Sequence, residues 1–471
     1  MDNKLNKVAT KAGVWYIIGN LLLKGVVFFS LPIFTRLLST SDFGTYNAYM
    51  AYEGIISAIV GLGLYGSVKN AKFDFKDKFD EYISSTLFMS LSVFISVLLI
   101  INIIYPLLQE VLGFSRFVTN CLLFQSLGAS FIQFYGAKLN IEFKYKSYLV
   151  ISIFNSIGSV LLSVALILFI FPQERYLGRI LGSTLPPMLV LLFVGTFILL
   201  RGKKFFYKKY WNYAKRISLP LVPHVVSQSI LSQFDRIMIR DMVGTSEAGI
   251  YSYMYTICTI TYVICMSLDN AWNPWLFYKL KEEQESEVYR ASPKYMELFA
   301  FITVGFVCVI PEVAKIMASA NYWDGMDLLI PISLSNFCIF LYLMPVSIEY
   351  YHKKTKFISI GTLTAAAINL LLNYVFIRFW GYKAAAYTTA ISYFILFFFH
   401  LKIAWKYNFN KIFNLRQLVR ITLIVIVSLI IIKLTFNIII VNLILRYLIV
   451  LVITVFILLK KDYYLSLLGG K

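Results

Sequence analysis

Apolar residues form long stretches that fill the chain almost from end to end, with short polar segments between them. An apolar run of about 20 residues is long enough to cross the hydrocarbon core of a bilayer as a helix. In lipid the backbone must satisfy its own hydrogen bonds, so each stretch is expected to be helical. The pattern therefore predicts an all-α, polytopic membrane protein with 12–14 transmembrane helices.

The expected spans form two sets of six and a final pair. The first set lies at 14–38, 43–68, 82–106, 116–140, 147–171 and 177–200. The second set lies at 217–240, 247–272, 295–318, 327–350, 357–379 and 382–405, and the pair at 416–438 and 441–460. Tyr, Ser and Gly dilute the second, fourth and eighth stretches, so the count stays open between 12 and 14.

Composition and motifs exclude several classes of protein. The 471 residues are 59% hydrophobic and 14% charged, with a mean hydropathy of +0.73, which is too apolar for a soluble chain. No Walker, HExxH or GxSxG motif is present, and the loops expected outside the membrane are short, so we predict a protein that is not an enzyme. The five cysteines form no CxxC pair and the three histidines are scattered, so neither a metal nor a cofactor is expected.

The net charge of +20 invites a nucleic-acid interpretation, but the distribution of the charge argues against it. Most of the 44 Lys and Arg residues lie at the N-terminus, in every second loop and at the C-terminus. This is the positive-inside bias, which places both termini in the cytoplasm and the chain in the cytoplasmic membrane. We interpret the basic stretch 201–216 as a topology signal that faces anionic lipid headgroups.

A heptapeptide pattern occurs twice at equivalent places in the helix order. Residues 40–46 (TSDFGTY) follow the first stretch, and residues 245–251 (TSEAGIY) follow the seventh. Local physics accounts for the pattern, because Ser or Thr caps a helix, an acidic residue favours its N-terminus, and Gly permits a tight turn. The recurrence indicates an internal duplication.

The duplication predicts the domain organisation. We expect a six-helix lobe at 1–200, a basic cytoplasmic connection at 201–216, a second six-helix lobe at 217–406, and two additional helices at 407–471. Because six is even, both lobes begin on the same side of the membrane. The lobes would then be related by a pseudo-two-fold axis along the membrane normal.

Charges placed within the apolar stretches are candidates for function, since they are costly in lipid. Lys24 lies near the middle of the first stretch, and Asn20 is one turn before it. Lys24 can bind an anionic substrate in a central cavity or form a buried ion pair with Glu53 of the second stretch, and the two roles are compatible. Tyr46, Tyr49 and Tyr52 precede Glu53 and suit either sugar rings or the aromatic belt of the interface.

The seventh stretch is unusually polar and should face water or protein. His224, Gln228 and Asp235 lie close to one helical stripe, which suits either the wall of a cavity or helix–helix packing. Asp235, Arg236 and Arg240 form a candidate gate of ion pairs at the outer end.

Four further groups of polar residues have simpler interpretations. Asp269, at the inner end of the eighth stretch, is either a gate or part of a helix cap. Arg36, near the outer surface, is placed either to attract phosphate or to snorkel. The sets Ser126, Ser130 and Gln133, and Asn369 and Asn373, are expected to form interhelical hydrogen bonds.

Three segments carry a resemblance to a known family. Residues 31–46 (LPIFTRLLSTSDFGTY) resemble the opening of bacterial polysaccharide flippases of the Wzx type. Asp235-Arg236 with the downstream Gly249 and Tyr251 resembles the start of their second half, and residues 369–386 resemble their eleventh and twelfth helices.

The resemblance implies the fold of the multidrug/oligosaccharidyl-lipid/polysaccharide (MOP) exporters, with two lobes around a central cavity. It implies that undecaprenyl-pyrophosphate-linked repeat units, used for O-antigen or capsule synthesis, move to the outer leaflet by alternating access. Lys24, and then Arg36 and Arg240, match by placement the cations that would meet pyrophosphate. Membrane lipids, a polysaccharide polymerase and chain-length machinery are the partners that it suggests.

Two other functions stay open. A cation-coupled multidrug exporter of the same superfamily would use a carboxylate in the N-terminal lobe; Glu53 favours that alternative and Lys24 opposes it. A membrane glycan polymerase or ligase would need a large outer loop with catalytic Arg or His residues, and the short loops count against it.

Overall fold

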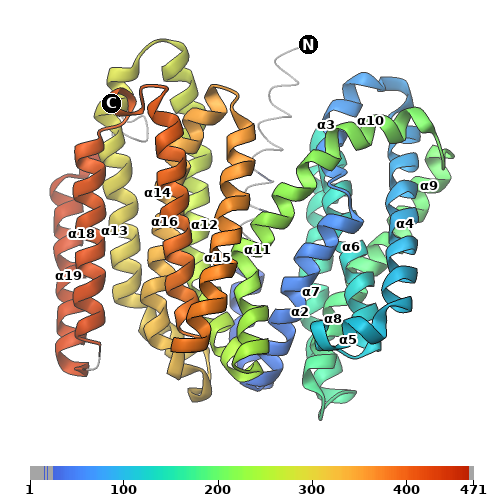
Figure 1. Cartoon of the computed structure of the whole chain (residues 1–471), viewed down its shortest axis with the longest axis horizontal. Coiled ribbons are helices and arrows are strands. Elements are labelled where there is room, and N and C mark those ends of the chain that lie inside the picture. The colour runs from blue at the N-terminus through green and yellow to red at the C-terminus, as the bar shows by residue number, and fades with distance from the viewer. Residues whose placement is uncertain (1–14, 16–18, 20–24, 437, 466–471) are drawn as a thin grey trace. The chain divides into compact units, whose positions relative to one another are not determined.

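The computed structural model describes residues 15, 19, 25–436 and 438–465, and every regular element among them is helical (Figure 1). The N-terminal part contains α2 (Thr40–Val60), α3 (Tyr65–Asp74), α4 (Phe79–Ile103), α5 (Tyr105–Leu112), α6 (Arg116–Ile141), α7 (Tyr145–Phe169), α8 (Arg175–Val190), α9 (Thr196–Gly202), α10 (Lys208–Ser218) and α11 (Val222–Met242). The C-terminal part contains α12 (Thr245–Lys281), α13 (Glu285–Met317), α14 (Leu329–Tyr351), α15 (Thr355–Trp380), α16 (Ala384–Trp405), α17 (Phe409–Ile412), α18 (Leu415–Leu434), α19 (Ile439–Leu459) and α20 (Lys461–Leu465).

Twelve helices in the described part of the chain are long and apolar enough to cross a membrane. This confirms the prediction of an all-α, polytopic membrane protein. The segment expected at 14–38 is described in part and contains a helix at 25–37. The segment expected at 217–240 is helical as α11, but its polar residues keep it outside the set of twelve.

Two of the differences from the expected spans bear on the candidate site residues. The stretch expected at 43–68 is two helices, because the backbone breaks between Val60 and Tyr65. Leu62 and Gly63 both have positive φ there, at 50° and 61°. The stretch expected to end at 272 continues to Lys281, so Asp269 lies inside α12; the alternative of a helix cap was wrong.

The N-terminus of α2 also differs from the expected motif. Its cap is Ser39, one residue before the repeated heptapeptide. The Ser39 hydroxyl accepts a hydrogen bond from the Asp42 amide at 3.0 Å, and the Asp42 carboxylate accepts one from the Ser39 amide at 3.2 Å. This is a capping box. Gly44 is buried within α2, so the expectation of a tight turn at that glycine was wrong.

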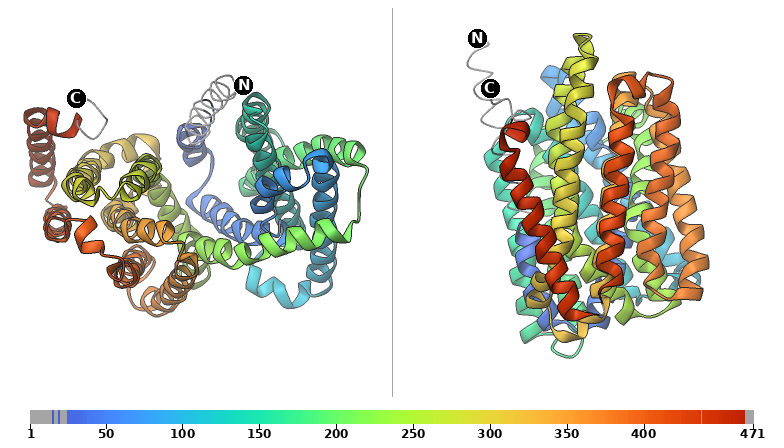
Figure 2. Two further views of the ribbon diagram at one scale, coloured as in Figure 1. Left: turned by 90° about the horizontal axis from the view of Figure 1, so that it is seen from above. Right: turned by 90° about the vertical axis from the view of Figure 1, so that its left-hand side faces the viewer.

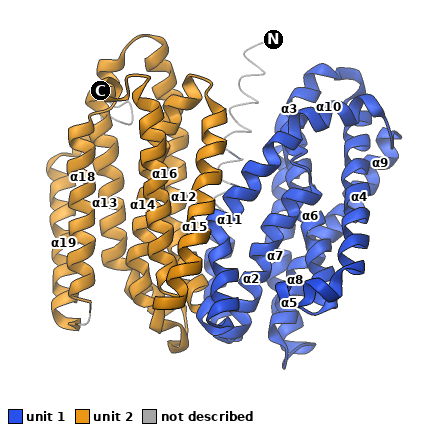
Figure 3. Cartoon of the chain, viewed as in Figure 1, with its two compact units in different colours: residues 1–248 blue, residues 249–471 orange. Residues whose placement is uncertain are grey.

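The chain forms two compact units, residues 1–248 and 249–471 (Figure 3). In the first unit, α2 packs against α6 and α11, and α8 packs against α6 and α7. The expected boundary at 201–216, with lobes at 1–200 and 217–406, stays a prediction.

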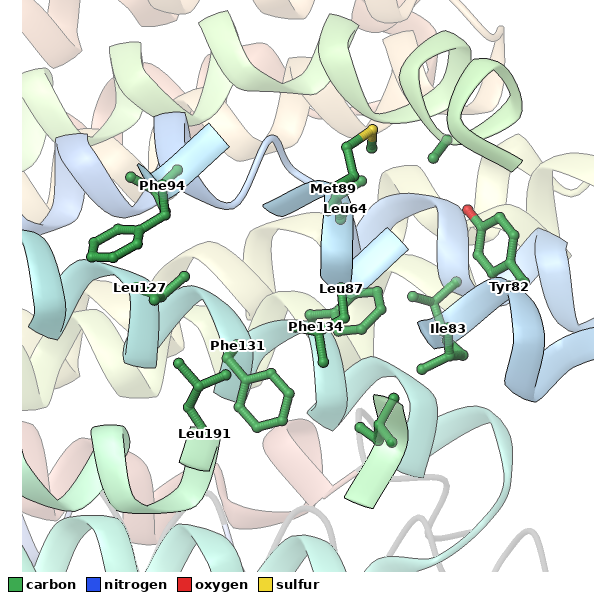
Figure 4. Close-up of a cluster of buried hydrophobic side chains, with 14 of the residues drawn as sticks. Leu64, Tyr82, Ile83, Leu87, Met89, Phe94, Leu127, Phe131, Phe134 and Leu191 are labelled. Carbon is green, nitrogen blue, oxygen red and sulfur yellow. The ribbon is translucent and has the colours of Figure 1, made fainter. Parts of the chain in front are cut away.

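The core of the first unit lies between α3, α4 and α6 (Figure 4). Leu87 from α4 and Leu127, Phe131 and Phe134 from α6 belong to this cluster, and each of the four is at most 4% exposed. Small residues bring α8 close to α7: a Cβ on Gly182 would lie 2.4 Å from the Ser163 Cα. Helices in lipid gain their association energy from such close packing.

In the second unit, α14 packs against α13 and α16, and α18 and α19 lie beside α13 (Figure 2). Arg446 joins α19 to α13 through the Glu312 carboxylate at 2.5 Å, and its side chain is 7% exposed. Lys433 of α18 similarly contacts Asp327 at 2.8 Å. The two additional helices are therefore attached by ion pairs as well as by apolar contact.

Candidate functional site

The break between α2 and α3 forms one side of a cavity in the first unit. Gly61, Gly63 and Leu64 belong to the cavity wall, and the Leu62 amide donates to the Ile59 carbonyl instead of continuing the helix. Gly61 also permits a close approach to α6, since a Cβ there would lie 2.7 Å from the Ser130 Cβ. Irregular backbone at membrane depth is tolerated where it is buried in protein or lines a water-filled space.

This first cavity has a volume of about 260 Å³ and lies between α2, α6 and α11. Its polar wall residues are Glu53, Ser57, Tyr65, Ser130, Gln133 and Ser229. Glu53 and Ser57 are one turn apart on α2, and Ser229 faces them from α11, where its hydroxyl lies 3.4 Å from the Gly54 carbonyl oxygen. Three helices thus direct hydroxyl, amide and carboxyl groups into one space.

Glu53 contributes the carboxylate of the first cavity. Its side chain is half-buried, and it makes no hydrogen bond or ion pair with any described residue. A carboxylate away from bulk water is stabilised by a cation, a hydrogen-bond donor or a proton. Glu53 is therefore placed to interact with whatever occupies the cavity. Lys24 and Asn20 lie outside the described residues, so their predicted roles stay predictions.

A second cavity of about 580 Å³ adjoins the first and lies between α3, α6 and α7. The two share Tyr65, Ala129 and Gln133. The other polar wall residues of the second cavity are Lys69, Asn140, Tyr148, Ser152, Asn155 and Ser156. Gln133 and Asn140 are exposed although α6 is a membrane-spanning helix, which indicates that they face water rather than lipid.

The expected role of the polar residues on α6 needs correction. The Ser126 and Ser130 hydroxyls bond to carbonyls of their own helix, at Leu122 and Leu127, and Ser130 and Gln133 line cavities. The interhelical hydrogen bonds come instead from Gln125, a residue that was not among the expected ones. Its side-chain oxygen accepts from Tyr49 at 3.0 Å and from Thr184 at 2.9 Å.

The aromatic residues of α2 face the interior of the first unit. Tyr49 is fully buried and bonded to Gln125, and the Tyr52 hydroxyl donates to the Val111 carbonyl at 3.1 Å. The Tyr46 ring lies 4.6 Å from the guanidinium carbon of Arg179. None of the three belongs to the described walls of the two cavities. Their fixed contacts favour packing over sugar binding.

The residues of α11 that line the first cavity lie on a different face of the helix from the predicted stripe of His224, Gln228 and Asp235. Among the described residues, Val222, Val225 and Ser229 line the first cavity, and His224 and Gln228 do not. The His224 Nδ1 atom is buried without a hydrogen-bond partner. Substrate binding by His224 and Gln228 stays a prediction.

The charged residues at the other end of α11 contact their neighbours in sequence. The Arg236 amide donates to the Asp235 carboxylate at 3.0 Å, and the Arg240 guanidinium contacts Asp241 at 2.6 Å. Arg240 also lies over the Phe114 ring, with 4.8 Å between the guanidinium carbon and the ring centroid. Such a contact stabilises a cation away from water. The gating role of Asp235 and Arg236 stays a prediction.

Two remaining candidates lie elsewhere. Arg36 is exposed and donates to the Pro32 carbonyl at 3.0 Å, one turn before it. Asp269 accepts a hydrogen bond from Asn273 at 2.8 Å within α12. The roles of Arg36 in binding and of Asp269 in gating stay predictions.

Buried polar contacts join helices of the second unit. Asn369 of α15 bonds to Thr389 of α16 at 3.3 Å, and Thr388 bonds to Asn373, which confirms the expected interhelical bonds. A further buried pair, not expected from the sequence, is Glu349 of α14 and His400 of α16, whose atoms Oε1 and Nδ1 lie 2.7 Å apart. In the sequence, this pair is visible only as one acidic residue and one histidine, each within an apolar stretch.

A family model supports an assignment by sequence. The model described as polysaccharide biosynthesis protein matches residues 9–278, which is more than half of the chain. The chain is also 22% identical over 391 residues to the Lsg locus putative protein 1 of Haemophilus influenzae. That alignment covers 79% of this chain and 93% of the relative.

Solved structures agree on the fold. The lipid II flippase MurJ, in an inward closed conformation, matches with a TM-score of 0.70 and 16% identity, over 96% of this chain and 99% of that one. An inward-facing multidrug resistance MATE family transporter of the MOP superfamily matches with a TM-score of 0.67 and 14% identity, over 85% and 98%. The fold expected from the resemblance is thereby confirmed.

Proposed function

Because this chain belongs to the polysaccharide biosynthesis protein family, we propose that it is a flippase for lipid-linked oligosaccharides in surface polysaccharide synthesis. The substrate would be a polyprenyl-pyrophosphate-linked repeat unit that moves from the inner to the outer leaflet of the cytoplasmic membrane. The chain would span that membrane many times, with both termini in the cytoplasm.

The first cavity is the observation that supports this proposal. It places a carboxylate, hydroxyls and an amide inside a unit built from membrane-spanning helices. Crossing the hydrocarbon core exposes a hydrophilic headgroup to lipid, and each unsatisfied polar group then costs several kcal/mol. A polar cavity replaces the hydrogen bonds that water supplies, while the lipid tail stays in the bilayer.

Alternating access would carry the headgroup across. The cavity would open first to the inner leaflet and then to the outer leaflet, as in transporters built from repeats. In this scheme Lys24 binds the negative charge of the pyrophosphate, with Arg36 and Arg240 as further cations. Glu53 would restrain Lys24 until substrate arrives.

Glu53 also favours a second candidate function, a cation-coupled multidrug exporter. A half-buried carboxylate on a cavity without an ion-pair partner among the described residues can bind a proton or a metal cation. Under this alternative the cavity would accept cationic drugs. Drug susceptibility of an efflux-deficient host that expresses the chain separates the two functions.

The direct test follows the lipid-linked oligosaccharide between leaflets in a strain that lacks this gene. We expect the oligosaccharide to accumulate in the inner leaflet of that strain and to reach the outer leaflet when the wild-type chain is restored. Ser57→Leu should fail to restore it, because the side chain would fill part of the first cavity. Ser92→Leu is the matched control, since both hydroxyls bond to a carbonyl of their own helix and Ser92 lines neither cavity.

Unchanged leaflet distribution in the strain that lacks the gene, together with drug resistance conferred by the chain, would overturn the proposal in favour of the exporter. Protein levels of each variant, measured in membranes, separate a transport defect from a failure to fold.

A further inference from the structure

The second cavity is lined by residues typical of a site for uncharged carbohydrate. Its wall combines three amides (Gln133, Asn140 and Asn155), two serines and two tyrosines, and Lys69 is the one charged residue among the described wall residues. Amides and hydroxyls can both donate and accept hydrogen bonds, as sugar hydroxyls require. An apolar ligand would leave these groups unsatisfied, and an anionic ligand would find a single cation.

Helical spacing directs these side chains into one space. Gln133 and Asn140 are two turns apart on α6, and Ser152 and Ser156 are one turn apart on α7. Gly136 lies between the two amides of α6, where a Cβ would contact the Tyr148 ring at 3.4 Å. Gly136 therefore lets the Tyr148 ring approach α6 between the two amides. An aromatic ring next to hydrogen-bonding groups suits the apolar and polar parts of a sugar.

One polar atom in this wall lacks a partner. The side-chain oxygen of Asn155 is buried and accepts no hydrogen bond. Ser152 is 7% exposed and belongs to the same face of α7. Buried acceptors without a donor destabilise a protein by about 1–3 kcal/mol, so their persistence in a cavity is expected where a ligand or water completes them.

We propose that the second cavity binds uncharged sugar residues of the transported oligosaccharide. This inference rests on the proposed flippase function and extends it by assigning the sugars to a second space that adjoins the first cavity. The sugars would pass from one cavity to the other beside the residues that both walls share, Tyr65, Ala129 and Gln133. A volume of about 580 Å³ is in the range of ligand pockets in proteins.

The test uses single cysteines as reporters of occupancy. All five native cysteines are buried, so the background reaction with a charged, membrane-impermeant methanethiosulfonate should be low in inside-out vesicles. Ser156→Cys reports on the second cavity and Ser57→Cys on the first. Vesicles are prepared from cells that make the lipid-linked oligosaccharide and from cells that lack the enzyme initiating its synthesis.

We expect both cysteines to react in vesicles without lipid-linked oligosaccharide, and both to react at least fivefold more slowly when it is present. Protection of Ser57→Cys alone would overturn the sugar assignment and leave the flippase proposal standing. Protection of neither would contradict both. A Ser156→Cys that never reacts would overturn the inference, because the second cavity would then be closed to water.

Substitution of the amides gives an independent readout. Asn140→Leu and Asn155→Leu belong to the second cavity alone, and each should slow export about tenfold through lost hydrogen bonds to the substrate. Asn70→Leu is the matched control, because this exposed amide on α3 lies outside both cavity walls. Export at the wild-type rate in both amide variants would overturn the inference, even where the flippase assay succeeds.

Discussion

The Thr40 hydroxyl lies 2.7 Å from the Ser246 hydroxyl, and Ser41 makes the reciprocal contact with Thr245 at 2.7 Å. Thr40 and Ser41 open the first copy of the repeated heptapeptide, and Thr245 and Ser246 open the second. Exchanging the two copies converts the Thr40–Ser246 contact into the Thr245–Ser41 contact. Reciprocal contacts of this kind are typical of a two-fold interface. The duplicated segments meet at equivalent positions, which gives the repeat a structural role.

A disulfide at this contact should stop transport. Two hydroxyls 2.7 Å apart place their side chains within reach of a disulfide after Thr40→Cys and Ser246→Cys substitution. If Thr40 and Ser246 separate during the proposed alternating access, export should fall under oxidation and return on reduction. Export by oxidised and fully cross-linked protein would show that the contact persists through the cycle.

The reciprocal pair is the control for that experiment. Ser41→Cys with Thr245→Cys should behave in the same way, because the two contacts are equivalent. Each single cysteine should export normally in either redox state. Gel mobility after proteolysis between the two positions measures the cross-linked fraction.

Arg446 should contribute strongly to the stability of the second unit. It is 5% exposed and bonded to both Glu312 and the Cys308 carbonyl. The Glu312 side chain is 36% exposed, so removing its partner costs less than the ~3–5 kcal/mol of a fully buried ion pair. Arg446→Met should therefore lower the melting temperature of the purified protein by about 2–4 °C.

The double variant Arg446→Met with Glu312→Gln isolates the ion pair from the packing of the arginine stem. We expect it to recover part of the lost stability, since no unpaired carboxylate remains. A single variant as stable as the wild type would contradict the account of how α19 is attached.

Glu349 and His400 should depend on each other in the same manner. Both side chains are fully buried and bonded at 2.7 Å. Glu349→Ala removes the partner of a buried imidazole, and we expect it to destabilise the protein by about 2 kcal/mol more than Glu349→Gln, which keeps an acceptor. Thermal unfolding of the two variants measures the difference. Equal melting temperatures would mean that this hydrogen bond contributes little.

The long apolar stretches predicted the helices well, because the period and length of a membrane span are local properties. The expected span 116–140 is α6, Arg116–Ile141. The break at 61–64 was missed, since glycines within an apolar stretch equally predict close helix packing. The break lines the first cavity, and the other walls of that cavity include α6 and α11, which lie far from the break in the sequence.

Among the candidate site residues, Glu53 lines the first cavity, and its role in binding stays a prediction. Gln125 and the Glu349–His400 pair were missed because their partners lie 51 or more residues away in sequence. Local spacing identifies a polar stripe on one helix. It does not identify the helix that the stripe meets.

Lys24 is predicted to bind the negative charge of the substrate. Lys24→Ala should lose most export at normal protein levels, and Lys24→Arg should retain it, because the positive charge remains. The measurement is surface polysaccharide in the complemented deletion strain. Full export by Lys24→Ala would remove this residue from the mechanism.

The passage of a hydrophilic headgroup through the first cavity is tested most directly by blocking that cavity in working protein. Ser57→Cys is first shown to support export, and a bulky, charged methanethiosulfonate is then attached to it. The account predicts that export stops on attachment and resumes when the reagent is removed by a reductant, while Ser92→Cys treated in parallel exports throughout. Undiminished export with Ser57→Cys fully modified would contradict it.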